Sequence, residues 1–135
     1  MELKDYIIYE NNNLITALLK IEKNKKGFLI VLNDEQVCCG TLSDGDIRRS
    51  IIANNDINEL VSNASTKEFV YVTEKDQFEK IIKLFKDNKI NFLPILDNTN
   101  KLVNVITKRN MHLLLLKNIE YEYNYNFIIH HRHYD

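Results

Sequence analysis

The sequence predicts a mixed α/β (α+β) fold in which two pseudo-symmetric β-α-β-β-α repeats pack sheet against sheet. Three observations predict it. Residues 6–52 align with residues 70–116 at a constant offset of 64, without a gap. Helical and strand periodicities recur at the same positions of both copies. In both copies the last predicted strand is followed by a hydroxyl residue, and an acid or an amide stands three residues after it. A repeat of this length indicates two supersecondary units that close a core against each other.

Each repeat is predicted to open with a short strand and a helix. Residues 6–9 and 69–72 are rich in aromatic and β-branched side chains, which strands favour. Apolar residues then recur at the i, i+3, i+4, i+7 spacing that places them on one helix face. Asn12 and Asp76 are predicted to cap these helices, and Asp76 forms a capping-box pattern with Glu79. The apolar faces comprise Leu14, Ala17, Leu18 and Ile21 in the first repeat and Phe78, Ile81, Ile82 and Phe85 in the second.

The second half of each repeat is predicted to be a β-hairpin followed by a helix, because two apolar runs flank a polar turn. Residues 54–68 are less apolar and are predicted to be a linker, so we assign the repeats to residues 3–60 and 61–117. A tail, residues 118–135, has no counterpart, and alternating aromatic residues over 121–127 predict a further strand there. The predicted hairpin strands are 28–32, 37–42, 92–96 and 101–106, and the closing helices are 44–53 and 108–116.

Composition argues against several functional classes. The formal net charge is −1, which offers no electrostatic attraction to nucleic acid or to an acidic membrane surface. No run approaches the roughly 20 apolar residues of a membrane span. The first residues lack the apolar core of a signal peptide, so we expect a cytoplasmic protein. No nucleophile–base–acid set and no glycine-rich phosphate loop occurs in the sequence, so we expect no enzyme activity.

The junction between the last strand and the last helix of each repeat is the most informative local feature. Ser43 is followed by Asp46, and Thr107 is followed by Asn110. One interpretation is structural: the hydroxyl and the acid or amide cap the helix start. The other is functional, because the free N–H groups of a helix start suit a phosphate, and a carboxylate one turn in can accept from ribose hydroxyls. In that interpretation the phosphate charge is neutralised by Arg48 and Arg49, or by Lys108 and Arg109.

This pattern resembles a known family. The repeat, its helix-then-hairpin spacing and the motif Gly-x-x-Ser-x-x-Asp-Ile-x-Arg at residues 40–49 are similar to a tandem CBS-domain pair, the Bateman module, over about residues 3–117. The junction at residues 42–49 most resembles CBS pairs attached to sugar-phosphate nucleotidyltransferases and arabinose 5-phosphate isomerases. The resemblance implies a regulatory module without catalysis or a required cofactor. It would bind an adenosine-containing ligand (AMP, ADP, ATP or S-adenosylmethionine) between its repeats and signal to a sugar-nucleotide or surface-polysaccharide enzyme.

The resemblance also implies which residues bind the ligand. Ser43 and Asp46 would hold phosphate or ribose in one cleft, and Thr107 and Asn110 would do so in the other. Because Asn110 lacks the charge of a carboxylate, we expect the first cleft to bind better. The other ligand-binding candidates are Gly27, Phe28, Asn91 and Phe92 at the central strands, Tyr71 and Thr73 in the opening strand of the second repeat, and Arg48, Lys108 and Arg109 at the junctions.

Two further expectations follow from the resemblance. Asn104 occupies the position of Gly40, which is usually small in relatives so that backbone and ligand can approach, and this departure also favours the first cleft. The family commonly forms homodimers through its helices, and residues 51–52 and 113–116 supply apolar surface of the kind that such a contact needs.

The cysteines and histidines have simple structural interpretations. Cys38 and Cys39 adjoin in a predicted strand, where neighbouring side chains point to opposite faces, so we expect two free thiols. His130, His131 and His133 are interpreted as a surface tract rather than a metal site. Two alternatives to the nucleotide-binding function stay open: a ligand-free dimerisation module, and the regulatory remnant of a sugar-phosphate nucleotidyltransferase.

Overall fold

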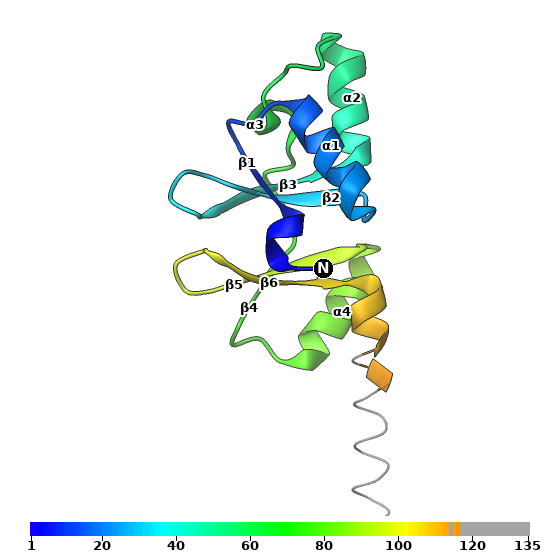
Figure 1. Ribbon diagram of the computed structural model, residues 1–135. Helices are drawn as coiled ribbons and strands as arrows, with labels where there is room; N and C mark the ends of the chain where they lie inside the picture. The colour runs from blue at the N-terminus through cyan, green and yellow to red at the C-terminus, as the bar shows by residue number, and fades with distance from the viewer. Residues whose placement is uncertain (114, 117–135) are drawn as a thin grey trace, which may run out of the picture. The chain divides into compact units, whose positions relative to one another are not determined.

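The computed structural model describes residues 1–113 and 115–116 (Figure 1). A short 3-10 helix and a strand precede the first long helix, a hairpin and two further helices. A strand, a helix and a hairpin follow, and residues 108–113 and 115–116 are again helical. The bounds are η1 Leu3–Tyr6, β1 Ile7–Tyr9, α1 Leu14–Asn24, β2 Phe28–Leu32, β3 Cys38–Ser43, α2 Asp44–Asn54, α3 Val61–Ala64, β4 Val72–Thr73, α4 Phe78–Asn88, β5 Phe92–Leu96 and β6 Leu102–Thr107.

The strands form two three-stranded sheets, ordered β1-β2-β3 and β4-β5-β6. In the first sheet β1 runs parallel to β2, and β2 runs antiparallel to β3 with Leu29 opposite Leu42. In the second sheet β4 runs parallel to β5, with Val72 opposite Ile95. The predicted mixed α+β class is therefore confirmed.

The backbone carries the internal repeat. α4, β5 and β6 each begin and end 64 residues after α1, β2 and β3. Left-handed residues recur at the same offset, with Lys25 and Lys89 after the helices and Gln36 and Asn100 in the hairpin turns. Equivalent hydrogen bonds join Glu10 N to Leu32 O and Glu74 N to Leu96 O, Asn33 N to Val37 O and Asp97 N to Lys101 O, and Asp44 N to Gly27 O and Lys108 N to Asn91 O.

Contacts divide the chain into two compact units that differ from the predicted repeats. The first unit comprises Met1–Asp76 and Pro94–Val105, and the second comprises Gln77–Leu93 and the described residues from Ile106 onward. The hairpin turn of the second repeat thus belongs to the first unit, where Cys38 N donates to Asn100 O at 2.9 Å. The repeat boundaries at residues 3–60 and 61–117 stay a prediction from the sequence.

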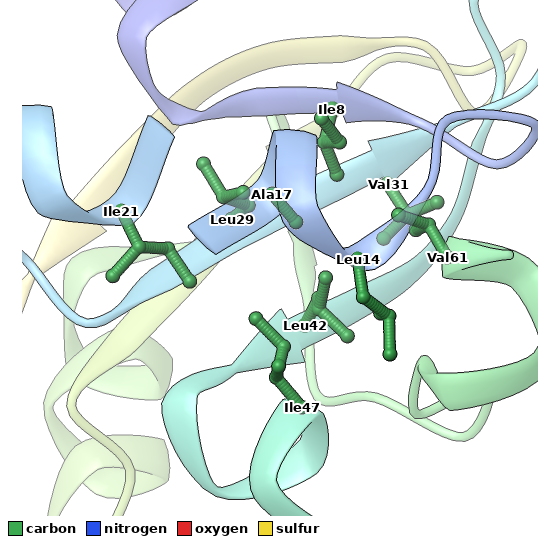
Figure 2. Close-up of a cluster of buried hydrophobic side chains, with 9 residues drawn as sticks. All are labelled: Ile8, Leu14, Ala17, Ile21, Leu29, Val31, Leu42, Ile47 and Val61. Carbon is green, nitrogen blue, oxygen red and sulfur yellow. The ribbon is translucent and has the colours of Figure 1, made fainter. Parts of the chain in front are cut away.

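The core of the first unit gathers side chains from all three strands and all three α-helices that precede β4 (Figure 2). The predicted apolar face of α1 lies in it, since Leu14 and Ala17 are fully buried and Leu18 packs against its edge. β2 is buried along its whole length, as expected of a central strand. The cluster comprises Ile8, Leu14, Ala17, Ile21, Leu29, Val31, Leu42, Ile47 and Val61.

The structure corrects the predicted helix caps. Asn13, rather than Asn12, caps α1, and α4 begins after Gln77, whose side chain makes no cap hydrogen bond. Asn12 and Asp76 instead accept from backbone N–H groups of the preceding strands, at 3.0 and 2.8 Å. A short polar side chain in such a loop can bond to the backbone on either side of it, and the sequence pattern does not distinguish the two.

Two predicted segment boundaries were also wrong. The opening strand of the second repeat is Val72–Thr73 rather than 69–72. The predicted linker at residues 54–68 contains α3, whose Val61 is fully buried. It also contains Thr66, which exchanges two backbone hydrogen bonds with Thr41. This segment is therefore an integral part of the first unit.

The predicted strand at 121–127 and the interpretation of His130, His131 and His133 as a surface tract lie outside the described residues. Within the described part of the chain, no helix is both long and apolar enough to span a membrane. Over the same residues, histidine, cysteine and carboxylate side chains form no group of three or more suited to a metal ion.

The cysteines are free thiols, as predicted. Burial raises the pKa of Cys38 to about 11. Burial also raises the pKa of Cys39 to about 11, and the Glu10 carboxylate, 3.6 Å from the Cys39 sulfur, adds to this shift. Both thiols therefore stay protonated at neutral pH.

We expect Leu42→Ala to lower the free energy of unfolding by about 2–5 kcal/mol, because it opens a cavity in the buried cluster. Leu19→Ala is the control, since Leu19 is 66% exposed and should change stability by no more than about 0.5 kcal/mol. Urea denaturation of both variants measures the difference. Equal costs would contradict the assigned core.

We expect both thiols to react slowly with iodoacetamide at pH 8, because the thiolate is the reactive form. The folded chain holds these protons more tightly than the unfolded chain, in which the pKa is about 9. The resulting stabilisation is complete below pH 9 and is lost as the pH rises towards 11. Alkylation rates from pH 7 to 11, with urea-unfolded protein as control, measure this, and fast labelling of the folded chain at pH 8 would contradict it.

Candidate functional site

The junction between β3 and α2 is built as a reciprocal cap. Asp46 N donates to Ser43 Oγ at 3.1 Å, and Ser43 N donates to Asp46 Oδ2 at 2.9 Å. This capping box satisfies one backbone donor at the strand end and one in the first helical turn. The structural interpretation of the motif is therefore realised in full at this junction.

The second carboxylate oxygen of Asp46 has two further partners. Arg49 Nη2 donates to Asp46 Oδ1 at 2.8 Å, and Thr66 Oγ1 donates to the same atom at 3.2 Å. The Asp46 side chain is 14% exposed, whereas the Arg49 side chain is 73% exposed. Arg49, predicted to neutralise a phosphate, here neutralises Asp46. The spacing of three residues on a helix could have indicated this pair, but nothing in the sequence indicated Thr66.

Four predicted ligand-binding residues meet at this junction. Gly27 O accepts from Asp44 N at 3.0 Å, and Phe28 lies opposite Ser43 in the β2–β3 ladder. Gly27 adopts φ +79°, a left-handed conformation that glycine takes without strain. These contacts bring four residues together where β2 begins, β3 ends and α2 starts: Gly27, Phe28, Ser43 and Asp46.

Phe28 is the buried member of this group. The residue is 4% exposed, and its ring stacks on Tyr6 with centroids 5.3 Å apart. A base that reached the Phe28 ring would have to displace Tyr6. On the outer side, a pocket of about 370 Å³ is lined by Gly27, Asp44, Lys25 and Lys26 together with residues of α1.

Gly40 is small for a different reason from the one expected. A Cβ atom at this position would stand 3.0 Å from Thr66 O and 3.2 Å from Ser65 Oγ. The close approach that requires glycine is therefore made by the backbone after α3. Asn104, at the equivalent position of the second repeat, is exposed.

The second junction is a partial version of the first. Asn110 N donates to Thr107 Oγ1 at 3.1 Å, and Lys108 N donates to Asn91 O at 2.7 Å. Among the contacts of the described residues, no bond returns from the Asn110 side chain to Thr107 N. Asn110, Lys108 and Arg109 are all exposed, and Asn91 is exposed beside the half-buried Phe92.

The other predicted site residues lie apart from these contacts. Arg48 is exposed on α2. Tyr71 is 45% exposed, with its ring tilted against Phe69. Thr73 donates from its backbone N and its Oγ1 to Asp76 Oδ2. In the described part of the chain, no hydrogen bond joins Arg48, Tyr71 or Thr73 to Ser43 or Asp46.

The sequence is similar to a known family and to several known proteins. Residues 61–117 match the CBS domain family. A 17.7 kDa protein of Acidianus ambivalens is 25% identical over 113 residues, which cover 84% of this chain and 68% of that protein. An arabinose 5-phosphate isomerase of Salmonella typhi is 24% identical over 94 residues, which cover 70% of this chain and 29% of the isomerase. The chain thus spans less than a third of that enzyme.

The fold has solved counterparts. The structure of CBSX2 in complex with AMP superposes with a TM-score of 0.74 at 20% sequence identity, covering 84% of this chain and 90% of CBSX2. A CBS domain pair/ACT domain protein from Thermotoga maritima superposes with a TM-score of 0.71 at 18% identity, covering 87% of this chain and 98% of that protein. Residues 61–117 are therefore a CBS domain, and the described chain has the fold of a tandem CBS pair, as the sequence predicted.

Proposed function

We propose that this chain is a regulatory, non-catalytic CBS-pair module of the cytoplasm that binds an adenine nucleotide at the Ser43–Asp46 junction. The observation that carries the proposal is the arrangement of a hydroxyl, a helix start and a carboxylate paired with an exposed arginine on one short segment. The AMP complex of CBSX2 supports adenosine as the ligand class. The location of the ligand between the repeats, and any binding at Thr107 and Asn110, stay predictions from the resemblance.

Binding at the first junction would proceed by exchange of partners. The Ser43 hydroxyl and the first-turn amides of α2 suit phosphate oxygens. Arg49 would leave Asp46 Oδ1 for the phosphate, since an exposed arginine can reorient at little cost. The released Asp46 oxygen would then accept from ribose hydroxyls, as a charged acceptor.

The contact between Asp46 and Thr66 offers a route from ligand to partner. It joins α2 to the segment after α3, so a ligand that takes the Asp46 oxygen would remove the side-chain contact between them, while the backbone bonds of Thr66 to Thr41 hold the segment in place. A ligand shifts such an equilibrium only through its different affinity for the two states. The similarity to arabinose 5-phosphate isomerases supports a partner enzyme that acts on sugar phosphates or sugar nucleotides.

The hydrogen bonds of Asp46 also favour a second candidate, a ligand-free dimerisation module. Both carboxylate oxygens already have partners within the chain. In this alternative, Ser43 and Asp46 are caps and nothing else. The two candidates differ in what loss of the Asp46 carboxylate does to nucleotide affinity.

We expect AMP, ADP or ATP to raise the melting temperature, since a ligand at a hundredfold excess over its Kd stabilises the folded state by about 2.7 kcal/mol. Asp46→Ala should abolish this rise and cost about 0.5–2 kcal/mol of intrinsic stability. Asn13→Ala is the matched control, because it removes the cap of α1 and leaves the first junction intact. Thermal unfolding with and without each nucleotide measures both effects.

The two candidates give opposite results in this experiment. Nucleotide stabilisation that survives in Asn13→Ala and disappears in Asp46→Ala supports the sensor. A flat response of the wild-type chain to adenine, guanine and pyrimidine nucleotides alike would replace it with the ligand-free module. Equal affinity of wild type and Asp46→Ala would reject the assigned site.

We also propose that the chain forms a homodimer through exposed apolar helix residues. Ile52 is 77% exposed, Leu113 is 50% exposed and Leu116 is 59% exposed, whereas Ile51 packs against the core of the first unit and offers no such surface. Ile52→Glu should convert dimer to monomer, because it would bury an unpaired charge at the contact. Sedimentation velocity measures the mass. Glu22→Gln, which changes an exposed residue of α1, is the control. A wild-type monomer would refute the proposal.

A further inference from the structure

The second unit has a surface pocket that the proposed function does not use. It measures about 540 Å³ and is lined by α4 and by the helix at residues 108–113. Phe85 and Met111 are each 7% exposed and, with Ile82, make the lining apolar on its buried side. The remaining lining residues are three lysines and a histidine, and all are exposed: Lys86, Lys89, Lys108 and His112.

The first unit has a pocket at the equivalent place with a different charge. Glu22 and Asp44 line it at the positions that Lys86 and Lys108 occupy 64 residues later. Because Lys25 and Lys26 also line the first pocket, two acids balance two bases there. The second pocket has three lysines and no acidic lining residue. The shared backbone therefore does not require lysine at these positions.

Helix stability explains only part of this charge. Lys86 and Lys89 stand at the C-terminal end of α4, where positive side chains interact favourably with the helix dipole. Lys108 stands in the first turn of a helix, where a positive charge is unfavourable and the equivalent Asp44 is favourable. Lys108 is thus placed against the preference of its own helix.

The lysines of the pocket lack a counter-charge in the described part of the chain. Within residues 1–113 and 115–116, neither Lys86, Lys89 nor Lys108 forms an ion pair with a carboxylate. Like charges gathered around one pocket repel one another, and a bound anion would relieve that repulsion. The apolar lining would at the same time favour an apolar group on the ligand.

We propose that this pocket binds an organic anion that carries at least two negative charges beside an apolar body, such as a phosphate monoester of an aromatic or aliphatic alcohol. Lys86, Lys89 and Lys108 bind the charged group, and Phe85 and Met111 contact the apolar body. None of these residues belongs to the Ser43–Asp46 junction. Lys108 is also a predicted phosphate-binding residue of the second junction, but Thr107 and Asn110 do not line this pocket, so the site is an addition to the proposed nucleotide site.

Phenyl phosphate is a suitable probe, since a phosphate monoester is mostly doubly charged at pH 7.5. A titration of the ¹⁵N-labelled full chain, followed by two-dimensional NMR, shows where it binds. Benzyl alcohol tests the apolar body without the charge, and inorganic phosphate tests the charge without the apolar body. We expect shift changes that cluster in residues 82–89 and 108–112, with phenyl phosphate binding more tightly than either control.

The duplicated backbone supplies matched variants. Lys86→Glu combined with Lys108→Asp installs the residues of the first pocket, which the same backbone already accommodates. We expect this double variant to bind phenyl phosphate at least about tenfold more weakly, a loss of about 1.4 kcal/mol. Lys75→Glu combined with Lys83→Glu changes the net charge equally at exposed positions outside the pocket lining, and should bind as wild type does.

A second pair separates affinity from stability. Lys89 and Lys25 are both left-handed, with φ 51° and φ 59°, so glycine at either position should raise the melting temperature. Only Lys89→Gly removes a cation from the second pocket. We expect weaker phenyl phosphate binding in Lys89→Gly and unchanged binding in Lys25→Gly, although both chains become more stable.

Three results would overturn the proposal. The shift changes could centre on residues 43–49 instead of the pocket. Benzyl alcohol could bind as tightly as phenyl phosphate. The two double variants could lose affinity equally, which would show general charge attraction in place of a defined site.

Discussion

The turn from β3 into α2 is the constraint on which the first unit depends. The Ser43–Asp46 box satisfies backbone donors on both sides of the turn, so the strand ends and the helix begins at fixed residues. Ile47 is thereby placed in the core, where the residue is 1% exposed. The same carboxylate reaches Thr66, which ties the segment after α3 to the helix start. The Asp46 side chain thus contacts the end of β3, α2 and the segment after α3.

Because the same side chains serve as cap and as candidate ligand contacts, the two roles of the junction are hard to separate. A helix start that presents a hydroxyl and a carboxylate satisfies its own backbone and is chemically suited to a phosphate and a ribose. The exposed Arg49 is the component that a purely structural cap does not need, because the box is complete without it. Its ion pair with Asp46 keeps the Arg49 guanidinium at the junction, where a ligand phosphate could compete with Asp46 for it.

The two repeats share their backbone geometry and differ in their side chains. The helices, hairpins and left-handed turns recur at an offset of 64, so the same local geometry is built twice. At the junctions, Ser43 and Asp46 of the first repeat correspond to Thr107 and Asn110 of the second, and the reciprocal cap of the first corresponds to a single bond in the second. At the pockets, Glu22 and Asp44 of the first repeat correspond to Lys86 and Lys108 of the second. The two copies share a scaffold and differ in chemistry, as expected when backbone hydrogen bonds fix the fold and surface residues carry specificity.

The sequence by itself determined the repeat, the order of its elements, the buried face of α1 and the capping box at Ser43. Each of these depends on local periodicity or on a contact within four residues. It did not determine whether Asn12 bonds forwards or backwards, because both partners lie within reach. Only the tertiary structure decided that Val61 enters the core, that Gly40 makes room for the backbone at Thr66, and that Thr66 bonds Asp46. These contacts join residues about 20 or more positions apart, and no local pattern records which distant segment folding will bring beside them.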